Sequence, residues 1–138
     1  MIDPSSYFHF SKTVFSFLIS EFGFIQTKEI KNGSAFYEVG YTNNRLLISV
    51  SYENVEEYLQ VIIYELYNGN VPHFDDSNHV FHLKDLNEEV FPKLRKLEFE
   101  ENNNFFRGFI SEVGVQSSLL KCAKELRLAL YYSEKIKG

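Results

Sequence analysis

The segment 71–83, VPHFDDSNHVFHL, concentrates side chains that can bind a metal ion or transfer a proton. Imidazole and carboxylate groups suit zinc, nickel, manganese or iron. The spacing leaves the geometry open, because His79 and His82 fall on opposite faces of a strand but share one face of a helix. We favour a solvated loop, whose Asp and Asn side chains make turn and cap bonds, and we expect no cofactor. The alternative is a metal site formed by His73, Asp75, His79 and His82, with Asp76 as a further capable ligand.

Other residue patterns that could support catalysis are weak. Pairs of carboxylates occur at 56–57, 88–89 and 98–101, and charge runs of this kind are most often solvated surface. The only cysteine, Cys122, falls in an apolar helical stripe, where a thiol is a small buried hydrophobe with a high pKa. The sequence has no GxSxG, GxGxxG or GxxxxGK[ST] motif. These patterns favour a protein that is not an enzyme.

Length and composition set the class of protein. The 138 residues fit a single domain over 1–138, and 14 Phe with 9 Tyr predict an aromatic core. The net charge of −5 argues against nucleic acid as a partner, because phosphate contacts need a basic face. A single cysteine and the lack of a long apolar stretch predict a cytoplasmic protein without a membrane span.

The N-terminal half of the chain changes from helical to alternating periodicity. Pro4, followed by two serines, is typical of a helix start, and Gly23 is placed to end that helix. Alternation predicts strands over 35–41 and 45–53, joined by a tight turn at Asn43-Asn44. A shorter strand over 24–30 with a turn at 31–34 precedes them. The residues expected to face the core are Tyr7, Phe10, Val14, Phe17 and Leu18 in the helix, and Ala35, Tyr37, Val39, Tyr41, Leu46, Ile48, Val50 and Tyr52 in the strands.

The C-terminal half is mainly helical. The apolar residues in 57–69 fit the period of a helix and also that of a strand, and their β-branched and aromatic content favours a strand. Residues 82–104 are predicted to be helical with a break near Pro92, and the asparagines at 102–104 to be a surface loop. Gly114 precedes the clearest helical stripe, which is Val115, Leu119, Cys122, Leu126 and Ala129. The order predicts an α+β fold with an N-terminal helix, an antiparallel sheet of three to four strands, and C-terminal helices packed on one face.

Three stretches resemble a known class of protein: EFGF after the first helix, YEVGYTNNRLLISVSYE in the hairpin, and SLLKCAKELRLAL in the last helix. With these stretches the chain resembles small bacterial α+β proteins of the type that confers immunity to polymorphic toxins. The resemblance covers most of the chain in outline, and no signature residue of an immunity family is matched. It implies a soluble, acidic protein that binds a toxin domain and blocks it.

Three functions from different classes are consistent with these features. The first is a non-catalytic protein-binding module of the immunity type, in which an acidic, aromatic surface receives Lys or Arg from a basic partner. The second is a metal- or ligand-binding domain or small enzyme that uses residues 73–82. The third is a homodimer whose aromatic residues cover an interface. The candidate partner-binding residues of the first function are Tyr52, Glu56, Glu57, Tyr58, Asp75 and Asp76.

Overall fold

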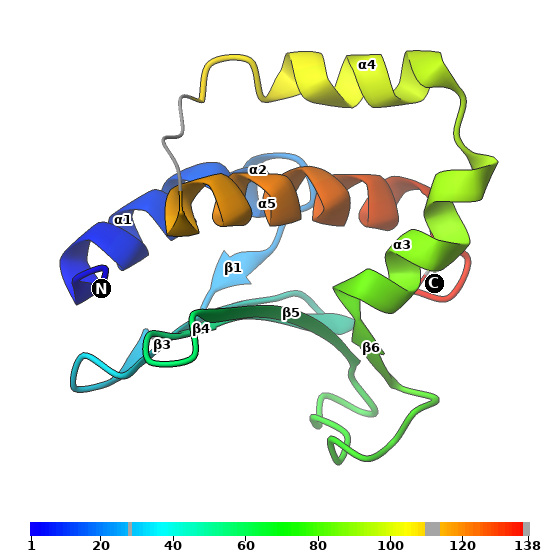
Figure 1. Cartoon of the computed structure of the whole chain (residues 1–138). Helices are drawn as coiled ribbons and strands as arrows, with labels where there is room; N and C mark the ends of the chain where they lie inside the picture. Colours follow the sequence, from blue (N-terminus) through cyan, green and yellow to red (C-terminus); the bar gives the residue numbers. More distant parts are fainter. Residues whose placement is uncertain (28, 110–113, 137–138) are drawn as a thin grey trace.

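An antiparallel sheet with helices on one of its faces forms the architecture, as the computed structural model shows (Figure 1). The structure describes residues 1–27, 29–109 and 114–136. Their elements are α1 (Pro4–Val14), α2 (Phe17–Ser20), β1 (Ile25–Gln26), β2 (Ile30–Asn32), β3 (Phe36–Thr42), β4 (Leu46–Glu53), β5 (Tyr58–Glu65), β6 (Val80–His82), α3 (Leu83–Val90), a 3-10 turn (Phe91–Lys93), α4 (Lys96–Phe105) and α5 (Val115–Tyr132). The predicted α+β class is confirmed. The predicted strand number is wrong, because the described residues form a six-stranded sheet.

The centre of the sheet is the run β3-β4-β5. The strand order is β1-β3-β4-β5-β6, and β2 pairs with the other part of the same edge of β3. Residues Val39, Val50 and Val61 are direct neighbours across the three central strands. The predicted hairpin is confirmed, and Asn43 forms its turn because its side-chain Oδ1 accepts hydrogen bonds from the amides of Arg45 (2.8 Å) and Leu46 (2.7 Å).

The edges of the sheet differ from the prediction. The expected strand over 24–30 is instead two short strands, β1 and β2, and the turn after them begins at Gly33, whose φ is +57°. Thr27 lies against the sheet between these strands, where its amide donates to the carbonyl of Gly40 over 2.8 Å. A Cβ at Gly40 would overlap the Thr27 hydroxyl, so any larger residue at this position would require Thr27 to move. The strand β6 was not predicted.

The helices follow the predicted order with two differences. α1 starts at Pro4 as predicted, and Asp3 caps it by accepting a hydrogen bond from the Ser6 amide over 2.9 Å. The first helix does not run unbroken to Gly23, because α1 ends at Val14 and the hydroxyl of Ser16 donates to the Thr13 carbonyl. The break at Pro92 is confirmed as a 3-10 turn. The asparagines 102–104 lie within α4 and are not a loop.

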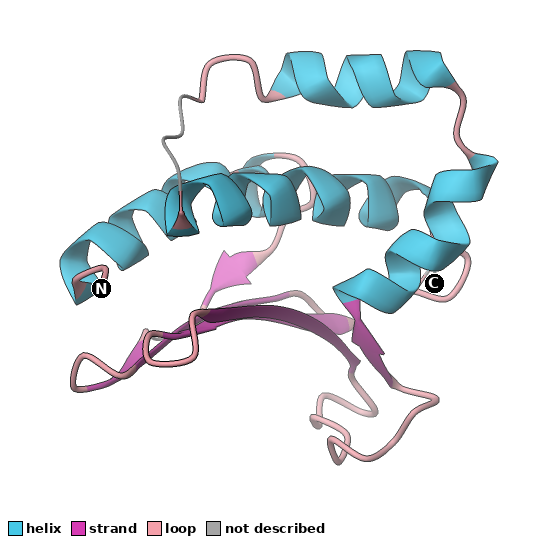
Figure 2. Ribbon diagram, in the orientation of Figure 1, coloured by secondary structure: helices cyan, strands magenta, loops and turns pink. Residues whose placement is uncertain are grey.

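The core lies between the sheet and the pair α1 and α5, which Figure 2 shows above the strands. All the core positions predicted in β3 and β4 from Tyr37 to Tyr52 are buried, whereas Ala35 is exposed and precedes β3. Tyr7 packs against the rings of Tyr37 and Tyr52, with centroids 5.1 and 5.9 Å apart, and donates its hydroxyl to the carbonyl of Val50. No helix of the described residues lies on the opposite face of the sheet (Figure 2).

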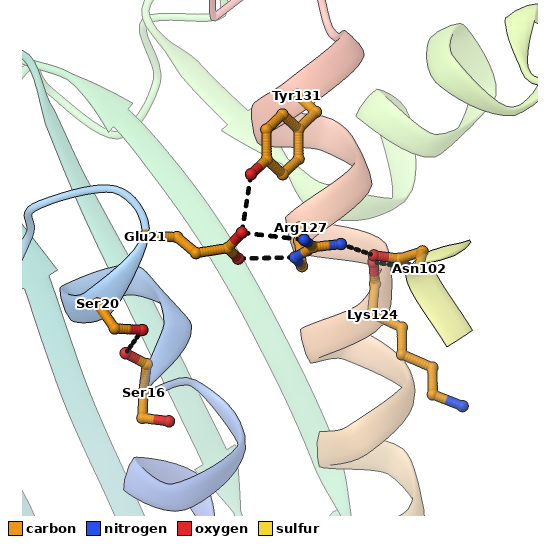
Figure 3. A network of polar contacts seen from close by, with 7 residues as sticks. All are labelled: Ser16, Ser20, Glu21, Asn102, Lys124, Arg127 and Tyr131. Carbon is orange, nitrogen blue, oxygen red and sulfur yellow. Dashed lines mark hydrogen bonds and ion pairs between the residues drawn. The ribbon is translucent and has the colours of Figure 1, made fainter. Parts of the chain in front are cut away.

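A polar network joins the end of α2 to α4 and α5 (Figure 3). The Arg127 guanidinium donates to both oxygens of Glu21, over 2.7 and 2.9 Å, and to the Asn102 side-chain oxygen over 2.9 Å. Tyr131 donates its hydroxyl to the same Glu21 carboxylate over 2.8 Å, and Arg127 also stacks on the ring of Phe105. Asn102 is buried because it makes these contacts and donates to the Lys124 carbonyl.

Candidate functional site

The His-rich stretch forms most of the loop at 66–79, the strand β6 and the start of α3. Asp76 organises the loop, since its carboxylate accepts a hydrogen bond from the Asn78 amide (3.1 Å) and lies 2.8 Å from His79 Nδ1. The hydrogen bond with His79 is the largest cause that lowers the pKa of the Asp76 carboxyl. His79 Nε2 also lies 3.8 Å from a carboxylate oxygen of Glu65. The turn role predicted for Asp76 is confirmed.

The four residues of the alternative metal site lie in separate places. His73 and Asp75 are both exposed, with 3.5 Å between Nδ1 and Oδ2. His79 lies in the turn before β6, beside Asp76 and Glu65, whereas His82 is the last residue of that strand. His82 instead lies beside the Gln60 side chain, 3.4 Å from Nε2 to Nδ1. Among the residues that the structure describes, no three His, Cys, Asp or Glu side chains form a group that could hold a metal ion.

The six candidate partner-binding residues lie in three places. Tyr52 is in the core with 4% of its surface exposed. Glu56 and Glu57 lie in the exposed turn before β5, and Tyr58 is the first residue of that strand. Asp75 and Asp76 belong to the loop after β5. Residues 56–58 and residues 75–76 therefore lie at opposite ends of β5 (Figure 1). The eight residues of this strand span about 26 Å.

The second of these groups, residues 75–76, borders a large concave surface formed by described residues. A groove of about 900 Å³, here called the α3 groove, runs between residues 74–78, β6, α3 and the chain after α5. Its side chains include Asp75 from the loop, Asp85 and Glu88 from α3, and Lys135. Phe74, which is 67% exposed, lies at the loop side of the groove. Carboxylates therefore outnumber cations in a concave surface that has an exposed aromatic ring.

One wall of the α3 groove is fixed by Glu89. Its carboxylate accepts hydrogen bonds from the Ser133 hydroxyl (2.6 Å), the Glu134 amide (2.8 Å) and the Lys93 ammonium (2.7 Å). Burial opposes ionisation of Glu89, but these three donors together lower its pKa to about 2. Glu89 was predicted to belong to a solvated pair, and it is instead a structural anchor that ties the chain after α5 to α3.

The sequence contains a pattern that indicates the carboxylates of the α3 groove, although no catalytic motif includes them. Asp85 and Glu88 are three residues apart, so they share a face of α3, and that helix begins directly after the His-rich stretch. What the spacing cannot show is that the loop at 74–78 folds back beside this face. The α3 groove therefore combines a predicted group, Asp75, with two residues that were predicted only as solvated charge or not at all.

Comparison of the chain with models of protein families, with curated proteins and with solved structures found no match. None of the described helices has the length and apolar character needed to cross a membrane.

Proposed function

We propose that this chain is a non-catalytic protein-binding module and that its α3 groove binds a basic segment of a partner protein. The observation that carries the proposal is the excess of carboxylates in that groove, where Asp75, Asp85 and Glu88 face a single lysine, Lys135, beside the anchored Glu89. Complementary charge accelerates encounter and orients a partner, and the net charge of −5 extends that attraction beyond the groove.

Phe74 supports the same proposal because it adds an exposed apolar surface beside the carboxylates. An aromatic ring exposed over two thirds of its surface gains free energy when a partner covers it, whereas isolated surface carboxylates contribute little by themselves. An Arg or Lys side chain that enters the groove could reach the carboxylates and also lie against this ring. In protein interfaces, aromatic residues are often found at the centre, with polar and charged residues around them.

The specific form of this function that we propose is immunity: the chain would bind a bacterial toxin domain and occlude it. The support for this specific form is the outline resemblance of the first helix, the hairpin and the last helix, together with the acidic groove. A toxin that acts on nucleic acid needs a basic surface, and an acidic groove is complementary to such a surface.

The test is co-expression of the chain with each product of the genes that flank its own. Any complex is purified, and its dissociation constant is compared between the wild type and the double variant Asp75→Asn, Glu88→Gln. The matched control is Glu100→Gln, Glu101→Gln, which removes the same charge from the exposed surface of α4. We expect about tenfold weaker binding for the groove variant, because two complementary charges are lost, and no comparable change for the control.

A second variant, Phe74→Ala, tests the apolar contact without any change of charge. We expect it to weaken the complex by about tenfold or more, mainly through faster dissociation. The proposal fails if no flanking product forms a complex, or if the groove and control variants weaken it equally.

A further inference from the structure

The edge of β5 is open along its first half. β6 pairs with β5 only at 62–64, and no other strand of the described chain pairs with this edge. Glu65 donates its amide to the carbonyl of His79, which shows that its backbone groups point to the β6 side. Because successive residues of an antiparallel strand alternate in direction, the N–H and C=O groups of Leu59 point to the same side. Val61 points that way too, but it is only 4% exposed and adjoins Ile62, which pairs with β6, so Leu59 is the residue that offers pairing groups to an added segment.

A second groove, of about 500 Å³, lies beside this open edge and is here called the β5-edge groove. Residues 58–61 form one wall, the start of α3 with Asp85 forms another, and Cys122 and Glu125 of α5 complete it. Burial raises the pKa of the Cys122 thiol to about 12, so only a small fraction of it is the nucleophilic thiolate near neutral pH. The groove therefore offers hydrogen-bonding groups for a bound segment and a thiol that reacts slowly.

Two acceptors in the β5-edge groove lack a positive partner. Burial raises the pKa of the Glu125 carboxyl, and a hydrogen bond with Asn87 and the charge of Lys121 only partly oppose this effect. The ion pairs formed among residues 1–27, 29–109 and 114–136 do not include Glu125. The Oδ1 atom of Asn87 is buried and has no hydrogen-bond partner among the same residues. A cation bound in the groove would offset the cost that burial imposes on the ionised Glu125 carboxylate.

We propose that the β5-edge groove binds an extended segment of a partner protein, which pairs with the main chain of Leu59 and places a Lys or Arg side chain beside Glu125. This inference rests on the proposed protein-binding function and adds a second contact with a defined chemistry. Main-chain pairing would supply affinity and the buried carboxylate would supply specificity, as in other cases of strand addition.

Charge favours a basic segment over a second copy of this chain as the occupant. A symmetric pair of β5 edges would bring two chains of net charge −5 together at a groove that also contains Asp85. Lys84 lines the groove and Lys121 lies near Glu125, and both are exposed. Neither forms an ion pair with Glu125 among the described residues, so this carboxylate can accept a cation from the bound segment.

The experiment uses random peptides of about nine residues, displayed on phage and selected on the full chain, a length that suits one strand. A selected peptide is then synthesised, together with a form whose basic residue is replaced by norleucine and a form with N-methyl groups at alternate residues. Binding of each is measured to the wild type, to Glu125→Gln and to the exposed control Glu100→Gln. The rate of alkylation of Cys122, which lines the groove, reports whether the peptide covers that site.

We expect selected peptides to share a Lys or Arg at one position and to slow the alkylation of Cys122. Glu125→Gln and the norleucine peptide should each weaken binding about tenfold or more, the N-methyl form should not bind, and Glu100→Gln should have no effect. The proposal is overturned if no peptide is selected, if selected peptides lack a common basic residue, or if they leave Cys122 equally reactive. A dimer detected by light scattering and abolished by Val61→Pro would also overturn it, in favour of a second copy.

The same variants separate this proposal from the proposed function. If the complex with a flanking gene product is weakened by Asp75→Asn, Glu88→Gln but not by Glu125→Gln, the groove at β5 is not a contact and the α3 groove remains one. If only Glu125→Gln weakens that complex, the α3 groove is excluded as its binding site.

Discussion

Substitution of Glu89 by Gln should lower the free energy of unfolding in a way that depends on pH. In the folded chain three donors hold the pKa of this carboxyl at about 2, against an ordinary value of 4.5. A gap of this size corresponds to ~3 kcal/mol at neutral pH. The Glu89 side chain is 13% exposed and the side chain of its partner Lys93 is more exposed. Because solvent screens the pair, we expect the substitution to lower the free energy of unfolding by ~2 kcal/mol.

The sign follows from the lowered pKa. A carboxyl whose folded pKa lies below its unfolded pKa stabilises the protein fully above the unfolded value of 4.5, and this contribution is lost as the pH falls towards about 2. The cost of Glu89→Gln should therefore be ~2 kcal/mol near neutral pH and less than half of that by about pH 3. Urea unfolding at a series of pH values measures it, provided that the slope against urea is unchanged.

Glu100→Gln is the matched control, because Glu100 makes an exposed contact with Lys96, and the cost of this substitution should stay within about 0.5 kcal/mol. The reasoning about Glu89 is refuted if Glu89→Gln costs the same near pH 3 as near neutral pH, or if it costs no more than the control. Either result would mean that the three hydrogen bonds do not hold the chain after α5 in place.

Three further predictions concern stability and reactivity. Arg127→Ala should lower the free energy of unfolding by ~3 kcal/mol, since it removes two charge-assisted bonds to Glu21 and a stacked ring contact, and a double-mutant cycle with Glu21→Gln should show strong coupling. Gly40→Ala should cost ~1 to 3 kcal/mol in urea unfolding, because its new methyl group displaces Thr27, and Thr27→Ala in the same chain should recover part of the loss. The Cys122 thiol should react with iodoacetamide more slowly near neutral pH than the same cysteine in the unfolded chain, and equal rates would contradict its raised pKa.

Elements that depend on local sequence were predictable. The hairpin depends on Asn43, whose own side chain forms the turn, and β3 and β4 begin and end within one residue of the predicted bounds. The last helix follows from a stripe of apolar residues in which Leu119 and Leu126 are fully buried. Such patterns can be read without knowledge of the rest of the chain.

Elements that depend on distant partners were not predictable. The strand β6 has only three residues inside a polar stretch, and it forms because β5 offers it an edge at 62–64. Asn102 lies in a run of asparagines typical of a loop, yet Arg127 and the Lys124 carbonyl bind its side chain and place it in a helix. In both cases tertiary contacts override local preference.

The candidate site also combines features that depend on local sequence with features that depend on distant contacts. The turn role of Asp76 could be predicted from its neighbours, but the α3 groove requires the loop at 74–78 to meet a helix face that begins several residues later. Tyr52 illustrates a conflict within the sequence, because its alternating position predicted burial while its chemistry suggested a partner contact. Its 4% exposure follows the alternation.

The first turn of α3 separates the two grooves, and His82 and Asp85 line both of them. A partner that filled both grooves would be bivalent, and its second contact would form at an effective concentration in the millimolar range even if either contact alone were weak. When one contact opened, the other would keep the partner close enough to rebind before it diffused away. The lifetime of such a complex would then depend on how rigidly one short helical turn holds the two contacts at a fixed spacing.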